Sequence, residues 1–256
     1  MQLKFVLVAA AGLTIAVASS LQAAEVKLMS SLGMRVMLTD LITDFERTTG
    51  HKVTAAYGAP GPIKTRIADG EPVDVAVLPA PGLDDLVKQG KIVADSKVIV
   101  ARSGMGVGIR VGAPKPDIST PEAFRRALLA AKSVSYSDPA IGSPSGAHVV
   151  KVLERLGIAE EMKAKSKPYN GPGYHTEFVA KGEIEISMAQ ISEILPVQGA
   201  ELAGPLPADL QLTTVYETGI ATATKDQAAA KAFITFLRSR AAAAVIKAKG
   251  MEPATP

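Results

Sequence analysis

A loop rich in serine, glycine and proline carries the residue types that bind anions. It spans residues 137–146 and runs into apolar residues at helical spacing between Val149 and Leu156. The first N–H groups of a helix have no intrahelical acceptor, and the helix dipole adds partial positive charge there. We therefore expect Ser143, Ser145 and Gly146 to bind an anion through hydroxyl and amide groups. An ordinary N-capped helix is the alternative interpretation.

Two earlier loops have a similar composition, and each also lies between an expected strand and an expected helix. One reads S-S-L-G at residues 30–33, and the other reads G-A-P-G-P at residues 58–62. Open α/β sheets bind ligands outside the carboxyl ends of their strands, where such loops converge. Ser30, Ser31 and Gly61 therefore join the predicted anion site.

Two cations follow these loops at helical spacing. Arg35 lies four residues after Ser31, and Lys64 lies three residues after Gly61, so each is expected on the face that its loop presents. Added Arg and Lys suit a ligand with separate carboxylates better than a compact dianion. The pair predicts an organic polycarboxylate, and solvated surface charges are the alternative.

Two histidines are candidates for chemistry. His148 lies in the first turn after the serine-rich loop, and His175 follows Tyr174 at the start of a further expected helix. All three side chains can donate to an anion, and an imidazole can also move a proton. Structural or exposed roles remain open for each histidine. The sequence has no H-E-x-x-H spacing and no G-x-S-x-G elbow, which argues against metal catalysis and nucleophilic hydrolysis.

Composition narrows the class of function. The chain has 256 residues, of which 47% are apolar, and its net charge of +3 is too small to indicate a nucleic acid partner. It has no cysteine, so disulfides and thiolate chemistry are excluded. Neither a Walker nor a Rossmann phosphate loop is present, and we expect no cofactor and no metal.

Residues 1–24 have the three parts of a cleavable secretory signal. Lys4 is followed by an apolar run from Phe5 to Val17 and then by small residues ending at Ala23 and Ala24. The apolar run is too short to span a bilayer as an anchor. We therefore expect an exported protein, in the periplasm if the source has two membranes.

The apolar pattern predicts an α/β fold of two lobes with a ligand cleft between them. Strand, loop and helix alternate three times before residue 90, which is typical of a parallel sheet. Residues 97–111 indicate two strands, and residues 134–137 begin a second α/β unit. Residues 212–223 are expected to cross back to the first lobe as extended chain, and residues 225–249 are expected to form an Ala-rich helical tail. We assign residues 25–105 and 215–256 to lobe 1, and residues 106–214 to lobe 2.

Five stretches carry a resemblance to a known family. They read S-S-L-G, Y-G-A-P-G-P-I-K-T-R-I, G-E-P-V-D-V-A-V-L-P, D-P-A-I-G-S-P-S-G and the Ala-rich tail. In them the chain resembles the periplasmic type II solute-binding proteins of the molybdate-binding group. The resemblance implies a two-lobed monomer that captures a small anion for an ABC permease.

The resemblance also places the family's site residues on this sequence. The first oxyanion-binding serine falls on Ser31, the position in the second lobe falls near Ser145, and the tyrosine that closes the site falls on Gln190. The second serine falls on Pro60, which has neither a hydroxyl nor an N–H. This departure favours a ligand other than molybdate.

Two functions follow from the resemblance. A binding protein would capture a polycarboxylate or oxyanion for uptake without chemistry. The molybdate-binding-like group also includes a periplasmic aconitate isomerase, which interconverts cis- and trans-aconitate by an allylic proton shift. In that case His148 or His175 would move the proton, and the loop donors would stabilise the developing charge. Fold class does not decide between the two.

Overall fold

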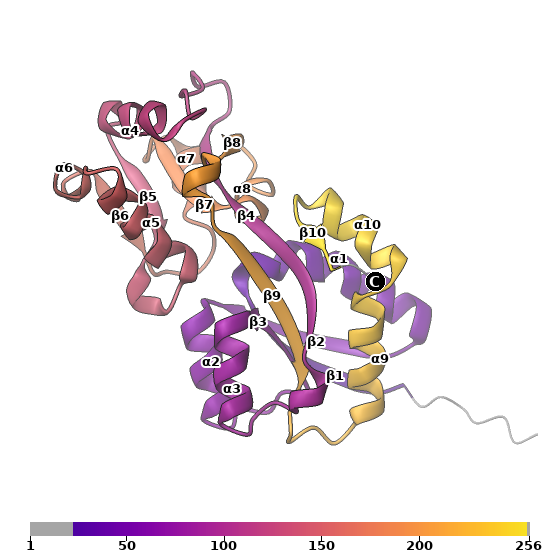
Figure 1. Ribbon diagram of the computed structural model, residues 1–256. Helices are drawn as coiled ribbons and strands as arrows, with labels where there is room; N and C mark the ends of the chain where they lie inside the picture. Colours follow the sequence, from indigo (N-terminus) through magenta and orange to yellow (C-terminus); the bar gives the residue numbers. More distant parts are fainter. Residues whose placement is uncertain (1–22, 255–256) are drawn as a thin grey trace, which may run out of the picture.

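Two lobes are joined by two long strands in the computed structural model, which describes residues 23–254. Strands β4 (Val98–Arg110) and β9 (Thr213–Ile220) run side by side from one lobe to the other (Figure 1). The signal segment predicted at residues 1–24 lies outside the described residues except for its last two positions. No helix within 23–254 is long and apolar enough to cross a membrane.

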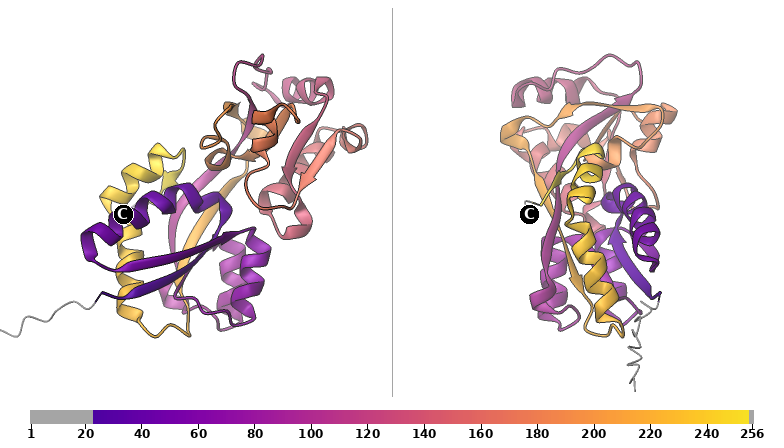
Figure 2. Two further views of the ribbon diagram at one scale, coloured as in Figure 1. Left: turned by 180° about the vertical axis from the view of Figure 1, so that it is seen from behind. Right: turned by 90° about the vertical axis from the view of Figure 1, so that its right-hand side faces the viewer.

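Lobe 1 has a mixed sheet covered by helices on both faces. Its strand order is β2-β1-β3-β9-β4, in which the first three strands are parallel and β9 is antiparallel to both of its neighbours. One face carries α1, α9 and α10, and the other carries α2 and α3 (Figure 2). The elements are β1 (Glu25–Ser31), α1 (Arg35–Thr49), β2 (Lys52–Gly58), α2 (Pro60–Ala68), β3 (Val75–Pro79), α3 (Ala80–Lys88), α9 (Gln227–Leu237), α10 (Arg240–Ala248) and the short β10 (Glu252–Pro253).

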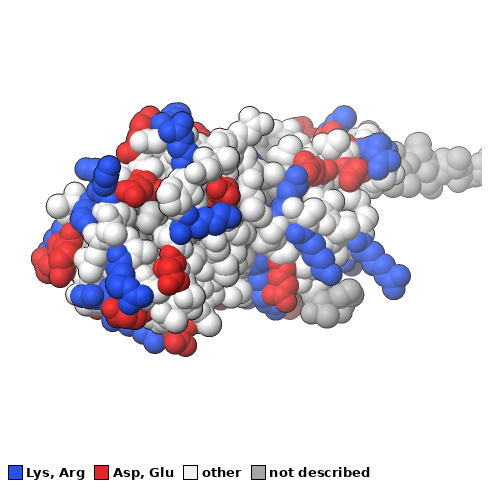
Figure 3. Space-filling model, turned by 90° about the horizontal axis from the view of Figure 1, so that it is seen from above, with Lys and Arg blue, Asp and Glu red and all other residues white. Residues whose placement is uncertain are grey.

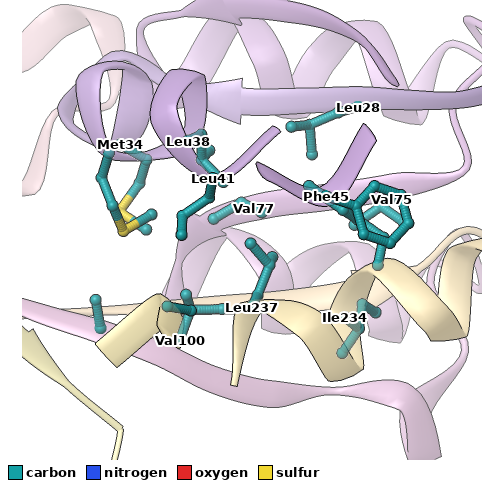
Figure 4. Close-up of a cluster of buried hydrophobic side chains, with 14 of the residues drawn as sticks. Leu28, Met34, Leu38, Leu41, Phe45, Val75, Val77, Val100, Ile234 and Leu237 are labelled. Atoms are coloured by element: carbon teal, nitrogen blue, oxygen red, sulfur yellow. The ribbon is translucent and has the colours of Figure 1, made fainter. Parts of the chain in front are cut away.

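The two faces of this sheet are both apolar because it is buried on both sides. Successive side chains of a strand point to opposite faces, so Val75 and Val77 pack against α1 and α9 while Leu78 packs against α2 and α3. Figure 4 shows the first of these clusters. At its centre the rings of Phe45 and Phe233 meet edge to face, with their centroids 5.0 Å apart.

Lobe 2 continues the sheet through the far half of β4. There β4 pairs with β7 and β8 in antiparallel fashion, and β5 is parallel to β6 and β7. Its core is a separate cluster that includes Val107, Phe124, Val149 and Met188. The elements are α4 (Pro121–Ala130), β5 (Val134–Ser137), α5 (Pro144–Arg155), α6 (Ala159–Lys163), β6 (Ser166–Tyr169), α7 (Thr176–Lys181), β7 (Ile186–Gln190), α8 (Ile191–Ile194) and β8 (Ala200–Pro205).

The predicted α/β fold with two lobes and a cleft is confirmed, and two local predictions need correction. The stretch expected to form two strands is the single strand β4 (Val98–Arg110), because Gly106 and Gly108 interrupt the apolar pattern without ending the strand and leave room for side chains of β7 and β8. The Ala-rich tail forms two helices, since the Ser239 hydroxyl accepts from the Ala242 N–H and starts α10. Strands β6 and β8 were not predicted.

Candidate functional site

A cavity of about 50 Å³ lies between the two lobes. This is several times the ~10–15 Å³ that a single water needs, so the closed cavity admits a small ligand. Both lobes contribute polar side chains to its wall. They are Ser31 and Tyr216 from lobe 1, Thr214 from the crossing strand β9, and Ser137, Ser143, Ser145, Tyr169, Tyr174, His175, Gln190 and Glu193 from lobe 2.

The lobes touch beside this cavity, and two of the contacts involve Gly61 and Tyr174. At the first, α2 meets the turn before α5 so closely that a Cβ on Gly61 would collide with the Ile141 carbonyl oxygen. At the second, the Tyr174 hydroxyl donates to the Leu32 carbonyl oxygen at 3.2 Å. Gly61 does not line the cavity, so its role in this structure is to permit closure rather than to offer a ligand donor.

Ser31 lies at the carboxyl end of β1 and faces the cavity. Its side chain is 1% exposed, and its hydroxyl has no hydrogen-bond partner. The adjacent Ser30 is equally buried, but its hydroxyl is 3.3 Å from the Ser31 carbonyl oxygen and it does not line the cavity. The period of two along a strand explains why the structure brings only one of the two predicted serines to the site.

The serine-rich loop reaches the cavity in part. Ser143 caps α5, because its hydroxyl accepts from the Gly146 N–H at 3.2 Å, and it lies 3.0 Å from the Ser145 hydroxyl. Both hydroxyls line the cavity at the positive end of a twelve-residue helix. The Gly146 amide is already bonded, and a Cβ at this position would collide with the Ser137 carbonyl oxygen. Gly146 therefore serves close packing here.

The structure does not bring Arg35 and Lys64 into the cavity. The Lys64 ammonium pairs with Asp85 on α3 at 2.8 Å, and this pairing holds the pKa of the Asp85 carboxyl below its usual value. The Arg35 guanidinium stacks on the Tyr174 ring, 4.8 Å from its centroid, and lies on the side away from the cavity lining. Along the described chain, no Lys or Arg lines the cavity.

The two candidate histidines occupy different environments. His148 is on a face of α5 that points away from the cavity, where its Nε2 donates to the Leu210 carbonyl at 2.8 Å. His175 lines the cavity and is 3% exposed, and neither of its ring nitrogens has a partner. Burial lowers the pKa of His175 to about 4. The imidazole is therefore neutral near pH 7 and has both nitrogens available to a ligand.

Gln190 lies in the floor of the cavity at the end of β7. With its amide turned so that both atoms are satisfied, it accepts from the Thr214 hydroxyl at 2.6 Å and donates to the Ser103 carbonyl at 3.0 Å. These bonds join the two crossing strands β4 and β9 to lobe 2. Gln190 holds the wall of the cavity in place and is 2% exposed.

Sequence reasoning missed a carboxyl and a phenol that share one wall. A Cβ on Gly33 would lie 2.5 Å from the Tyr216 hydroxyl and 3.1 Å from Glu193 Oε1, so both groups crowd the same glycine. Burial raises the pKa of Glu193 to about 7. Burial and the nearby Glu193 carboxyl raise the pKa of Tyr216 well above its usual value. The available signal was the position of Glu193, three residues after a strand end that points at the cleft.

Comparison with known proteins places this geometry in a family. The family model described as bacterial extracellular solute-binding protein matches residues 26–252. The chain belongs to this family. The predicted resemblance to molybdate-binding-like members is thereby confirmed at the level of the family.

Two relatives of this chain have names that indicate different functions, one an enzyme and the other a binding protein. A protein named aconitate isomerase from Pseudomonas sp is 33% identical over 233 residues, covering 88% of this chain and 86% of its own. The molybdate-binding protein ModA of Azotobacter vinelandii is 30% identical over 243 residues, covering 91% and 92%.

Solved structures of solute-binding proteins share the fold. The periplasmic molybdate-binding protein of Azotobacter vinelandii superposes with a TM-score of 0.76 at 23% identity, covering 90% of this chain and 99% of that one. The sulfate-binding protein SubI of Mycobacterium tuberculosis has a TM-score of 0.75 at 19% identity, covering 91% and 88%.

Proposed function

We propose that this solute-binding protein captures one small anion in the cavity between its lobes, in the periplasm, and delivers it to an ABC permease. The observation that carries the proposal is the state of the cavity donors. The Ser31 hydroxyl and both His175 nitrogens are buried in the wall without partners. A buried polar group without a partner costs about 1–3 kcal/mol, and a ligand that bonds to these groups recovers that free energy.

The chemistry of the wall favours an anion over a neutral ligand. Most of the polar groups in the wall are hydroxyls, and those of Ser143 and Ser145 lie at the N-terminus of α5, where the helix dipole is positive. Relatives named for molybdate and sulfate support the same class. Because Arg35 and Lys64 point elsewhere, the cavity suits a compact carboxylate or oxyanion held by neutral donors, and the structural basis for an extended polycarboxylate is weaker than the sequence suggested.

A matched pair of serine variants tests this proposal. Calorimetric titration of the mature protein with sodium molybdate, sodium sulfate and trans-aconitate, each separately, should reveal binding of one anion per chain. Ser31→Ala should weaken that binding ten- to a hundredfold, since a hydrogen bond to a charged ligand contributes about 1.5–3 kcal/mol. Ser135→Ala removes an equally buried hydroxyl outside the cavity and should leave affinity unchanged. Equal losses in the two variants would refute the site.

Isomerisation of aconitate is a second candidate, and His175 is the observation that favours it. An unprotonated imidazole with free nitrogens inside a closed cavity can take a proton from carbon. The electron pair of that C–H bond then forms the new double bond, and the former double bond accepts the proton at its far end. The relative named aconitate isomerase supports this reading of the same site.

Proton NMR distinguishes chemistry from binding. In deuterated buffer, an isomerase should interconvert cis- and trans-aconitate and incorporate deuterium at the exchanging carbon. His175→Gln should then abolish turnover while retaining binding, whereas His148→Gln, placed outside the cavity, should retain turnover. Binding of aconitate with no interconversion would exclude the isomerase.

A further inference from the structure

Glu193 is a carboxyl group in the wall of an anion cavity. It projects from α8 at the carboxyl end of β7, and its Oε1 lies beside Gly33 of the opposite lobe. The Tyr216 hydroxyl from β9 crowds the same glycine. Contact between the lobes therefore places the Glu193 carboxyl beside Gly33 and the Tyr216 hydroxyl, in the wall of the cavity.

No Lys or Arg in the part of the chain that the structure describes forms an ion pair with the Glu193 carboxyl. The titratable groups that interact with the Glu193 charge are Tyr216 from β9 and Tyr174 from the segment before α7, and His175 lines the same cavity. Arg35 of α1 lies over the Tyr174 ring, 4.8 Å from its centroid, and forms no ion pair with Glu193.

An ionised carboxylate and an anion cannot share so small a space without a strong mutual penalty. Like charges that share a site disfavour one another's ionised form, and a low local dielectric enlarges the effect. The neutral acid, by contrast, has an O–H group that donates to an anion. Burial already raises the pKa of Glu193 to about 7, and an anion in the cavity raises it further.

We propose that Glu193 receives the ligand as the neutral acid, so that each anion enters the cavity together with one proton and is released more readily at alkaline pH. This inference rests on the proposed capture of an anion and adds the identity of one donor and the pH at which it acts. It predicts a binding protein that holds its ligand most tightly below about pH 7.

Proton counting by calorimetry tests the inference. Titrations with sodium sulfate, sodium molybdate and trans-aconitate, each separately, are performed near pH 8 in two buffers with different ionisation enthalpies. These anions carry no titrating proton at that pH, so any proton taken up enters the protein. Wild type should take up close to one proton per bound anion, and its affinity should fall about tenfold per pH unit between about pH 8 and 9.

Glu193→Gln keeps an N–H donor at this position and cannot ionise. It should bind without proton uptake and with a flat pH profile, and it should exceed wild type in affinity at about pH 9. If His175 rather than Glu193 took up the proton, proton uptake would persist in this variant. Glu177→Gln is the matched control, because Glu177 lies in α7 outside the cavity, and it should retain the uptake of wild type.

Binding by wild type without proton uptake would overturn the inference and leave anion capture intact, whether or not the variant folds. Persistent uptake in Glu193→Gln would overturn it as well. Absence of heat with all three anions between about pH 6 and 9 would contradict the proposed function, and this inference with it.

Discussion

The pH dependence of stability gives a test that needs no ligand, because the pKa values of two groups in one cavity, the buried His175 and the half-buried Glu193, shift in opposite directions. Burial lowers the pKa of His175 from 6.5 to about 4 and raises the pKa of Glu193 from 4.5 to about 7. Through linkage, each of these two pKa shifts corresponds to roughly 3 kcal/mol of folding free energy at the end of its pH range.

His175 and Glu193 change the free energy of unfolding in opposite directions as the pH rises. Between about pH 6.5 and 4 the unfolded chain protonates His175 and the folded chain does not, so this histidine lowers stability as the pH falls. Between about pH 4.5 and 7 the folded chain holds a proton on Glu193 that the unfolded chain has lost, so this carboxyl lowers stability as the pH rises. In wild type the two slopes largely cancel between about pH 4.5 and 6.5.

Single variants should reveal how each of the two groups makes the unfolding free energy depend on pH. The unfolding free energy of His175→Gln relative to wild type should rise by up to about 3 kcal/mol as the pH falls from about 6.5 to 4. That of Glu193→Gln relative to wild type should rise by a similar amount between about pH 4.5 and 7.

Urea denaturation followed by circular dichroism measures both differences, and it suits a chain without tryptophan. His148→Gln serves as the control because His148 bonds to Leu210 outside the cavity. Differences that do not vary with pH would refute the burial of these two groups in the folded chain.

Three further predictions concern packing. Gly61→Val should force α2 away from Ile141 and weaken anion binding more than tenfold in calorimetry, with little change in melting temperature, because the clash lies between the lobes. Gly146→Ala should lower the unfolding free energy by about 1–3 kcal/mol or more, measured in urea, because its Cβ would collide with the Ser137 carbonyl. Phe233→Ala should cost about 3–5 kcal/mol in the same assay, since the ring is fully buried in lobe 1; a loss under 1 kcal/mol would contradict that packing.

Local signals explain why the sequence predicted the fold and part of the site. Glycines and prolines lie within a few residues of the strand ends and mark them, so the serine-rich loops at Ser31 and Ser143 could be located from their neighbours alone. The parallel order of β1, β2 and β3 follows from the same alternation of strand and helix.

Long-range contacts explain what the sequence could not predict. Lys64 is 21 residues from Asp85 along the chain, yet it pairs with that residue. The choice between His148 and His175 depends on which face of α5 packs against the rest of lobe 2. Glu193 reads as an exposed residue of a short helix until closure brings Gly33 of the other lobe against it.

A structure with a bound anion tests the central claim most directly. Crystals of the mature protein grown with molybdate, whose metal is located by anomalous scattering, should show one peak between the lobes, within hydrogen-bond distance of the Ser31 and Ser145 hydroxyls. Crystals grown with trans-aconitate should show a carboxylate at the same place. An anion held instead at Lys64 on the outer surface, or a cavity that stays empty at saturating anion, would contradict the account.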